Sequence, residues 1–269
     1  MSGRPRLSVL VIAVLVMAEM TVQPASASDE PIAYTSYAKF PQPGGVDFPY
    51  FTTGKLYVSF PGFSNQCSAS AITSENQSVL VTAGHCLYDF PSRTWGSNVM
   101  FVPAKYYGSE PLGRWTIWNI SYINGFVNND DRDRDIMFAV ANRNASGQTL
   151  HSVTGAYGWT FNRADRDEEY HMMGYPGGAW GGERLMNCDS KYGGTVSQSA
   201  GDDGTMVGCD WIVGGASGGA LLKKFSGTFA GYTNNQVGII QGRLPHGQGA
   251  AATYFGNEAL SAFNQVRNA

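Results

Sequence analysis

The sequence is poor in charged residues, which make up 14% of its 269 positions against about 25% in an average soluble domain. Its formal net charge is only −3, so it lacks the basic field that holds a nucleic acid. The hydrophobic residues, 43% of the chain, fall in readable patterns, which argues against a disordered chain. Few charges together with 34 glycines argue against long ion-paired helices and favour a structure with many tight turns.

Long apolar runs are absent except for one near the amino terminus. It covers residues 7–20, follows two arginines and precedes Ala25-Ser26-Ala27. This order of basic, apolar and small residues is typical of a secretory signal peptide. The run of about 14 residues is too short for a membrane anchor, which needs about 20. We therefore predict a signal peptide at residues 1–27, a secreted extracellular protein, and no membrane association once the peptide is removed.

Cysteines are few, and none of the four lies in a C-x-x-C pair. An even number in an exported chain predicts disulfides. Three connectivities are possible, and we favour Cys67–Cys86 with Cys188–Cys209 because each closes a loop of about 20 residues. A zinc site is not predicted, since His85 and Cys86 are adjacent and no H-E-x-x-H motif occurs.

Short apolar stretches separated by turn residues follow a region rich in proline and glycine at residues 28–50, which is a pro-segment or an N-terminal extension. Stretches of this kind at this spacing predict an all-β sandwich or barrel rather than βαβ units. A polar break at residues 142–147 divides two β-rich halves, 51–147 and 148–269. Asn257 is predicted as the N-cap of a closing helix that places Leu260, Phe263 and Val266 on one face. The predicted strands are Lys55–Phe60, Ser68–Ile72, Ser78–Ala83, Asn98–Val102, Ile136–Val140, Ser152–Gly158, Tyr170–Gly174, Gly194–Gln198, Thr205–Val213, Ala220–Leu222 and Gln236–Gln241.

Three segments carry candidate catalytic residues. His85 ends an apolar strand beside a predicted disulfide, which would hold a general base rigid. Ser217 lies in Gly214–Gly219, where glycines allow main-chain N–H groups to approach one oxygen. Asp135 is the last polar residue before an apolar strand, where a carboxylate can be buried and aimed; Asp133 is the second choice. Each segment also has an ordinary structural interpretation: a lone histidine is usually packed or partly exposed, a Gly/Ser stretch is usually a flexible loop, and a run of charged residues is usually a solvated loop.

The order of these residues, His then Asp then Ser, separates two classes of serine hydrolase. Gly215-x-Ser217-x-Gly219 also satisfies the G-x-S-x-G motif of the α/β-hydrolases. Those enzymes need an acid and then a histidine after the serine. Here no Asp follows Ser217, and Glu258 comes after His246 rather than before it. The α/β-hydrolase alternative is therefore excluded.

From about Phe51 onward, the chain resembles the secreted trypsin-like serine endopeptidases of the chymotrypsin fold, in particular the extracellular microbial branch that includes the glutamyl endopeptidases. The resemblance rests on Thr82-Ala83-Gly84-His85-Cys86, Asp135-Ile136-Met137 and Gly215-Ala216-Ser217-Gly218-Gly219. It implies two six-stranded antiparallel β-barrels and a C-terminal helix. The active site would lie between the barrels, with His85 and Asp135 from the first and Ser217 from the second.

The resemblance also implies a mechanism. Ser217 would be the nucleophile, His85 the general base and acid, and Asp135 the residue that orients the imidazole. The backbone N–H groups of Gly215 and Ser217 would form the oxyanion hole. Polypeptides would be the substrates of a monomer that needs no metal or organic cofactor.

The chain departs from the family pattern beside the nucleophile. Vertebrate members have an Asp there that pairs with a freshly cut amino terminus, whereas this chain has Ala216. We expect the loop to be ordered by its own packing, supported by Trp211 and the Cys188–Cys209 disulfide.

The substrate pocket is predicted from two further segments. Its walls are assigned to Trp211, Ile212, Ile240, Gln241 and Gly242. A glutamyl-specific member would have a His in the second of these segments, so cleavage after Glu is not predicted. Two alternatives stay open: a catalytically silent binding protein and an esterase on the same fold.

Overall fold

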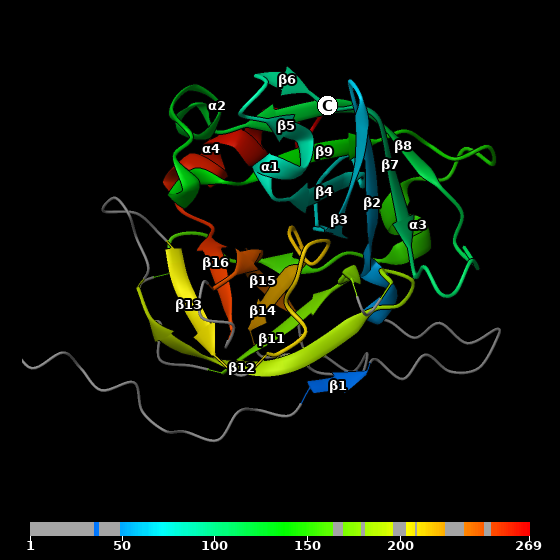
Figure 1. Cartoon of the computed structure of the whole chain (residues 1–269). Helices are drawn as coiled ribbons and strands as arrows, with labels where there is room; N and C mark the ends of the chain where they lie inside the picture. Colours follow the sequence, from blue (N-terminus) through cyan, green and yellow to red (C-terminus); the bar gives the residue numbers. More distant parts are fainter. Residues whose placement is uncertain are drawn as a thin grey trace, which may run out of the picture. The chain divides into compact units, whose positions relative to one another are not determined.

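Six antiparallel strands of the first half form a closed barrel in the computed structural model, with the order β2-β3-β4-β9-β8-β7 (Figure 1). A separate hairpin, β5 with β6, follows the segment that carries His85. The barrel strands are β2 (Thr53–Phe60), β3 (Phe63–Ala71), β4 (Val79–Thr82), β7 (Ser97–Pro103), β8 (Trp115–Tyr122) and β9 (Met137–Ala141), and the hairpin strands are β5 (Tyr88–Asp89) and β6 (Thr94–Trp95).

The structure describes most of the chain. All described residues belong to one unit, Pro31–Ala269, and the predicted signal peptide lies outside them. No helix in the described part of the chain is both long and apolar enough to cross a membrane. The described ranges are 35–37, 49–163, 169–178, 181–195, 203–207, 209–223, 234–244 and 249–269.

The centre of the first barrel lies where β4 meets β9. Val81 is paired with Phe138, and every residue of both strands is buried. Continuous apolar runs of this kind need a core on both faces. One face is filled by the barrel interior, and the terminal helix α4 (Asn257–Val266) packs against β8 and β9 from outside.

The second half forms a sheet with the strand order β1-β12-β11-β14-β15-β16-β13. In addition, β12 pairs with β13, and β10 pairs in parallel with β15. β1 comes from the predicted pro-segment or N-terminal extension. The strands are β1 (Thr35–Tyr37), β10 (Gly158–Trp159), β11 (Glu169–Gly174), β12 (Met186–Gly194), β13 (Asp203–Val207), β14 (Ala220–Lys223), β15 (Asn235–Arg243) and β16 (Ala250–Tyr254).

In the described part of the chain, helices are few and short, as the composition indicates. Besides α4 there are α1 (Gly84–Leu87), α2 (Asn124–Asn129), α3 (Leu150–Thr154) and the 3₁₀ turns η1 (Tyr50–Thr52) and η2 (Arg132–Arg134). α1 contains His85 and precedes the hairpin of β5 and β6. η2 ends just before Asp135 and precedes β9.

The strand predicted at Ser152–Gly158 is wrong for its first part, which is the helical turn α3. The hydroxyl of Thr154 donates to the Leu150 carbonyl, 3.0 Å away, so side-chain bonding stabilises a turn that β-branched residues disfavour. Gly155, at φ +62°, ends it. Of the residues in the predicted strand, only Gly158 lies in one, β10.

The closing helix is confirmed, with one correction at its start. Gly256 is the N-cap rather than Asn257, because its backbone is extended and its carbonyl accepts from the Leu260 N–H at 3.0 Å. Phe263 and Val266 are buried on the predicted face, and Leu260 is partly buried.

Candidate active site

His85 is placed by a sharp change of direction at the end of β4. Gly84 begins the helical turn α1 there, and a Cβ at this position would lie 2.7 Å from the Phe126 ring and 2.9 Å from Asp135 Oδ1. Only glycine therefore allows the backbone to approach the carboxylate so closely. The His85 side chain is 28% exposed, so one edge of the imidazole is accessible to a substrate.

Asp135 lies between η2 and β9, and its carboxylate is fully buried. Its Oδ2 is 2.6 Å from His85 Nδ1, and its Oδ1 accepts the backbone N–H of His85 at 2.7 Å. The Asp135 carbonyl also accepts the Gly84 N–H at 3.2 Å. Because a carboxylate only accepts, the proton of a neutral imidazole is on Nδ1 and Nε2 carries the lone pair. Asp133, the second choice, lies within the 3₁₀ turn itself.

The loop of Ser217 packs against the strand ends that lead to His85. The Ser217 carbonyl accepts the N–H of Ser68 at 2.8 Å and lies 3.8 Å from Cys86 Sγ. Gly218, at φ +80°, is pressed so close that a Cβ would lie 2.2 Å from Thr82 Oγ1. The sequence motif at Ser217 and the motif at His85 therefore meet in space. Ser217 itself is 8% exposed.

Of the three predicted catalytic residues, the structure joins His85 and Asp135 by direct hydrogen bonds. Among the described residues, the Ser217 hydroxyl has no hydrogen bond to His85. Such catalytic bonds are often long without substrate and tighten in the complex.

Two peptide groups in the Ser217 loop are fixed through their carbonyls. The Gly214 carbonyl accepts the Gly177 N–H at 2.7 Å, and the Ala216 carbonyl accepts the Gly219 N–H at 3.0 Å. The C=O and N–H of a trans peptide point in opposite directions, so the N–H groups of Gly215 and Ser217 point away from these partners. Neither N–H donates to another group in the described ranges. Two unpaired N–H groups beside a serine can bind an oxyanion.

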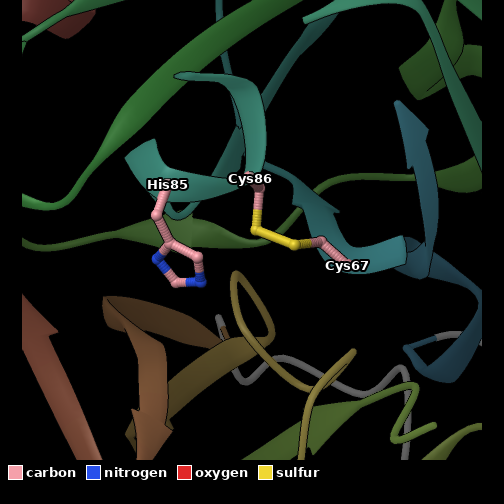
Figure 2. Close-up of side chains that lie close together, drawn as sticks. All are labelled: Cys67, His85 and Cys86. Carbon is pink, nitrogen blue, oxygen red and sulfur yellow. A yellow bond between two sulfur atoms is a disulfide. The ribbon is translucent and has the colours of Figure 1, made fainter. Parts of the chain in front are cut away.

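Both predicted disulfides are present, Cys67–Cys86 and Cys188–Cys209. Figure 2 shows His85 beside Cys86 on α1, with the disulfide reaching Cys67 on β3. These three residues are also the one group in the described chain with metal-ligand atoms close together. Both sulfurs are in the disulfide, so neither is a thiolate that could bind zinc.

The five residues predicted to wall the substrate pocket have different environments. Trp211, Ile212 and Ile240 are fully buried in the core of the second half. Gln241 is partly exposed, and its amide donates to the Arg132 carbonyl in the turn before Asp135. The pocket assignment stays a prediction.

A hollow of about 390 Å³ lies elsewhere, on β6 to β8, where the rings of Trp95, Trp118 and Tyr122 are exposed. It contains none of the three predicted catalytic residues.

Comparison with known proteins gives structural neighbours only. No family model matches the chain, and no curated protein matches it. The protease Anisep from Arthrobacter nicotinovorans is 28% identical, with a TM-score of 0.73, over 82% of this chain and 97% of that one. The thermostable serine protease AL20 from an extremophilic microorganism is 27% identical, with a TM-score of 0.72, over 81% and 97%. A Glu endopeptidase shares the fold at 15% identity, with a TM-score of 0.66, over 83% and 93%. The resemblance to the chymotrypsin-fold serine endopeptidases of bacteria that the motifs indicate is therefore confirmed.

Proposed function

We propose that the protein is a secreted serine endopeptidase that cleaves polypeptides through an acyl-enzyme. The observation that carries the proposal is the pair of hydrogen bonds that the buried Asp135 carboxylate accepts from the ring and the backbone N–H of His85. The structural neighbours support serine-type endopeptidase activity. They also support a second barrel in the second half, where β12 pairs with both β11 and β13.

The mechanism follows from the roles of these groups. Ser217 Oγ attacks the scissile carbonyl carbon while His85 Nε2 takes its proton, and Asp135 stabilises the imidazolium that forms. The carbonyl oxygen becomes an oxyanion, which the N–H groups of Gly215 and Ser217 bind. The tetrahedral intermediate collapses, the C–N bond breaks, and His85 gives its proton to the leaving amine. Water, activated by His85, then hydrolyses the ester to Ser217.

Specificity for Glu is not part of the proposal. The Glu endopeptidase shares only the fold with this chain, and β15 presents Ile239, Ile240 and Gln241 in the predicted pocket segment, without a histidine.

A fluorophosphonate probe tests the proposal, because it reacts only with an activated serine. We expect one labelled peptide, which contains Ser217, and no labelling of Ser217→Ala or His85→Ala. A folded wild-type protein that stays unlabelled would contradict the proposal and favour the silent binding protein. Turnover of simple esters without cleavage of any peptide in a library would favour the esterase instead.

A further inference from the structure

The residue before the nucleophile is Ala216, so the loop has no carboxylate of its own at this position. The Ala216 side chain is fully buried against the second core, where an ammonium group would be strongly disfavoured. The loop nevertheless holds the Gly215 backbone at φ +100°, a conformation that only glycine adopts readily. Some other contacts must therefore fix this peptide.

Ser68, on β3 of the first half, makes two hydrogen bonds to the nucleophile loop and one to Tyr175. Its N–H donates to the Ser217 carbonyl at 2.8 Å, and its hydroxyl donates to the Gly215 carbonyl at 2.8 Å. The same hydroxyl accepts the Tyr175 N–H at 2.8 Å. Ser68 is fully buried, and its own carbonyl accepts the Thr82 hydroxyl at 2.8 Å. The hydroxyl thus joins the nucleophile loop to the segment that begins at Tyr175.

The segment that begins at Tyr175 packs directly against the backbone of Gly215. A Cβ on Gly215 would lie 2.8 Å from the Tyr175 carbonyl and 2.9 Å from the Gly177 nitrogen, so no space is left between the two chains. The Gly177 N–H holds the Gly214 carbonyl at 2.7 Å, which turns the Gly215 N–H to the opposite side. The segment returns on itself where the Gly182 N–H donates to the Pro176 carbonyl at 2.7 Å.

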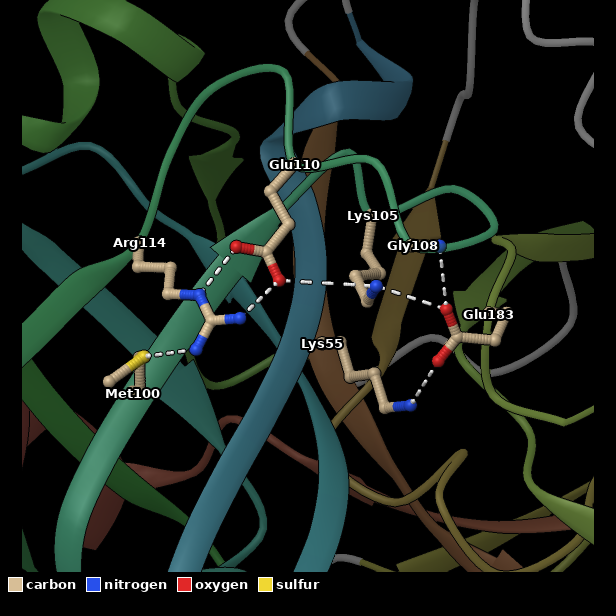
Figure 3. A network of polar contacts seen from close by, with 7 residues as sticks. All are labelled: Lys55, Met100, Lys105, Gly108, Glu110, Arg114 and Glu183. Atoms are coloured by element: carbon tan, nitrogen blue, oxygen red, sulfur yellow. Dashed lines mark hydrogen bonds and ion pairs between the residues drawn. The ribbon is translucent and has the colours of Figure 1, made fainter.

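Glu183, at the end of this segment, forms ion pairs with two buried lysines of the first half, Lys55 and Lys105 (Figure 3). Glu183 Oε1 is 3.4 Å from Lys55 Nζ, and its Oε2 is 3.0 Å from Lys105 Nζ and 3.0 Å from the Gly108 nitrogen. The two lysines are 2% and 6% exposed. Lys55 is paired directly with Ser68 across β2 and β3, so both side chains lie on the face toward the second half.

The ionisation of this cluster is consistent with an ion pair. Burial lowers the pKa of Lys55, and the adjacent Glu183 raises it in part. Burial raises the pKa of Glu183, but hydrogen bonds from Lys105 and the Gly108 amide outweigh this and bring the pKa below its ordinary value. Removal of one partner would leave a buried charge unpaired.

We propose that Ser68 and Glu183 are positioning residues that keep the oxyanion-hole N–H of Gly215 directed at the substrate. Ser68 fixes the Gly215 carbonyl, which lies in the peptide that follows the Gly215 N–H, and so limits rotation of the backbone at Gly215. The pairing of Glu183 with Lys55 and Lys105 fixes the segment that holds the Gly214 carbonyl, which lies in the same peptide as the Gly215 N–H. Together they order a loop that has no carboxylate beside the nucleophile. The inference rests on the proposed endopeptidase function.

Ser68→Ala is the first test, and Ser70→Ala is its matched control. Ser70 lies on the same strand, is equally buried, and donates to Gln236 in the second half at 2.8 Å, but it does not contact the nucleophile loop. We expect Ser68→Ala to lower kcat roughly 10- to 100-fold with KM nearly unchanged, since loss of one oxyanion donor costs about 10²–10³ and a misdirected donor costs less. Ser70→Ala should stay within about twofold, and Ser68→Thr should recover most of the loss because it keeps the hydroxyl.

Glu183→Gln tests the second element, with Glu110→Gln as its control. Glu110 Oε1 lies 3.9 Å from the same Lys105 but is not on the Tyr175–Glu183 segment. We expect Glu183→Gln to lower kcat and to weaken a peptide boronate, which mimics the tetrahedral intermediate, by the same factor. Glu110→Gln should change neither value by more than about twofold.

Hydrogen exchange of the amides in 212–219 separates this inference from the proposed function. Faster exchange in Ser68→Ala and Glu183→Gln than in their controls is expected whether or not the protein cleaves peptides. An unlabelled wild type would refute the endopeptidase, whereas normal kcat and unchanged exchange in folded Ser68→Ala and Glu183→Gln would refute the positioning role. If Ser68→Ala does not fold, Glu183→Gln and its control Glu110→Gln decide the question.

Discussion

At the scale of single residues, the role of Asp135 depends on which nitrogen of His85 carries a proton. The carboxylate holds the imidazole with N–H toward itself, and the accessible nitrogen is then a base. An asparagine at this position can donate its own amide hydrogen to Nδ1, which selects the other tautomer. The position of the His85 ring would be kept, but its Nε2 would carry the proton and could no longer act as a base.

Asp135→Asn should therefore lower kcat by roughly 10⁴-fold while the protein stays folded. The matched change Asp133→Asn should cost less than about tenfold, because Asp135 makes the hydrogen bonds to His85. Steady-state kinetics with a peptide substrate measures both. A large effect of Asp133→Asn beside a small effect of Asp135→Asn would show that the acid is misassigned.

His151 is a second histidine with a defined role, which is structural. Its Nε2 lies 3.0 Å from the Val79 carbonyl at the start of β4, and burial lowers the pKa of His151 from 6.5 to about 4. Above about pH 6.5, both folded and unfolded chains hold it neutral. Between about pH 6.5 and 4, only the unfolded chain binds the proton, so stability falls as the pH falls through this window.

Loss of this titration should flatten the pH dependence of stability. His151→Gln keeps a donor for the Val79 carbonyl, so we expect a stability near that of wild type at about pH 8. At about pH 4.5 the wild type should have lost up to about 3 kcal/mol more than the variant. Urea unfolding at the two pH values measures the difference. Parallel loss in both proteins would assign the acid sensitivity to other groups.

At the scale of elements, the nucleophile loop depends on a glycine that allows contact between the halves. Gly218→Ala would place a Cβ 2.2 Å from the Ser68 carbonyl oxygen at φ +80°. We expect a loss of more than about 2 kcal/mol in the free energy of unfolding, because backbone cannot move aside. Gly214→Ala, where a Cβ meets no atom within 4 Å, should change it by less than about 1 kcal/mol. Equal losses would mean that the contact is not tight.

Elements with a strong local signal could be predicted from the sequence, and those without one could not. The strands predicted at Ser78–Ala83, before His85, and at Ala220–Leu222, after Ser217, are apolar between turn residues and form as expected. The strand predicted at Thr205–Val213 is confirmed only as far as Val207, and residues 209–213 are not in a strand. β8, β12 and β16 were not predicted, because their local signal is weak: β8 exposes the rings of Trp118 and Tyr122, β12 ends in two glycines, and β16 begins with three alanines. Their pairing depends on partners far along the chain. The triad motifs can be recognised because each is a short run of neighbouring residues. Ser68, Lys55 and Glu183 act through contacts with residues more than 100 positions away in the sequence, and hydrophobic periodicity carries no information on such contacts.

At the scale of the whole molecule, the last helix stabilises the first barrel. Phe263 is fully buried and contacts the rings of Phe138, Phe161 and Trp159, with centroids 5.4 to 5.7 Å apart. The Asn76 amide also donates to the Val266 carbonyl at 2.7 Å. The last helix therefore belongs to the same core as the first barrel.

Phe263→Ala should accordingly destabilise the protein by about 3–5 kcal/mol, through lost burial and the cavity left among the rings. Ser261→Ala, on the exposed side of α4, should stay within about 0.5 kcal/mol. Denaturant unfolding followed by tryptophan fluorescence measures both, and a small effect of Phe263→Ala would show that the barrel is stable without the helix.

The position of α4 also sets an order of events during synthesis. β8 and β9 are made early, yet the helix that covers them is made after all strands of the second half. A growing chain thus exposes the outer face of its first barrel until residues 257–266 have emerged. The core of the first barrel is complete only after α4 has joined it, and contacts so distant in sequence close slowly.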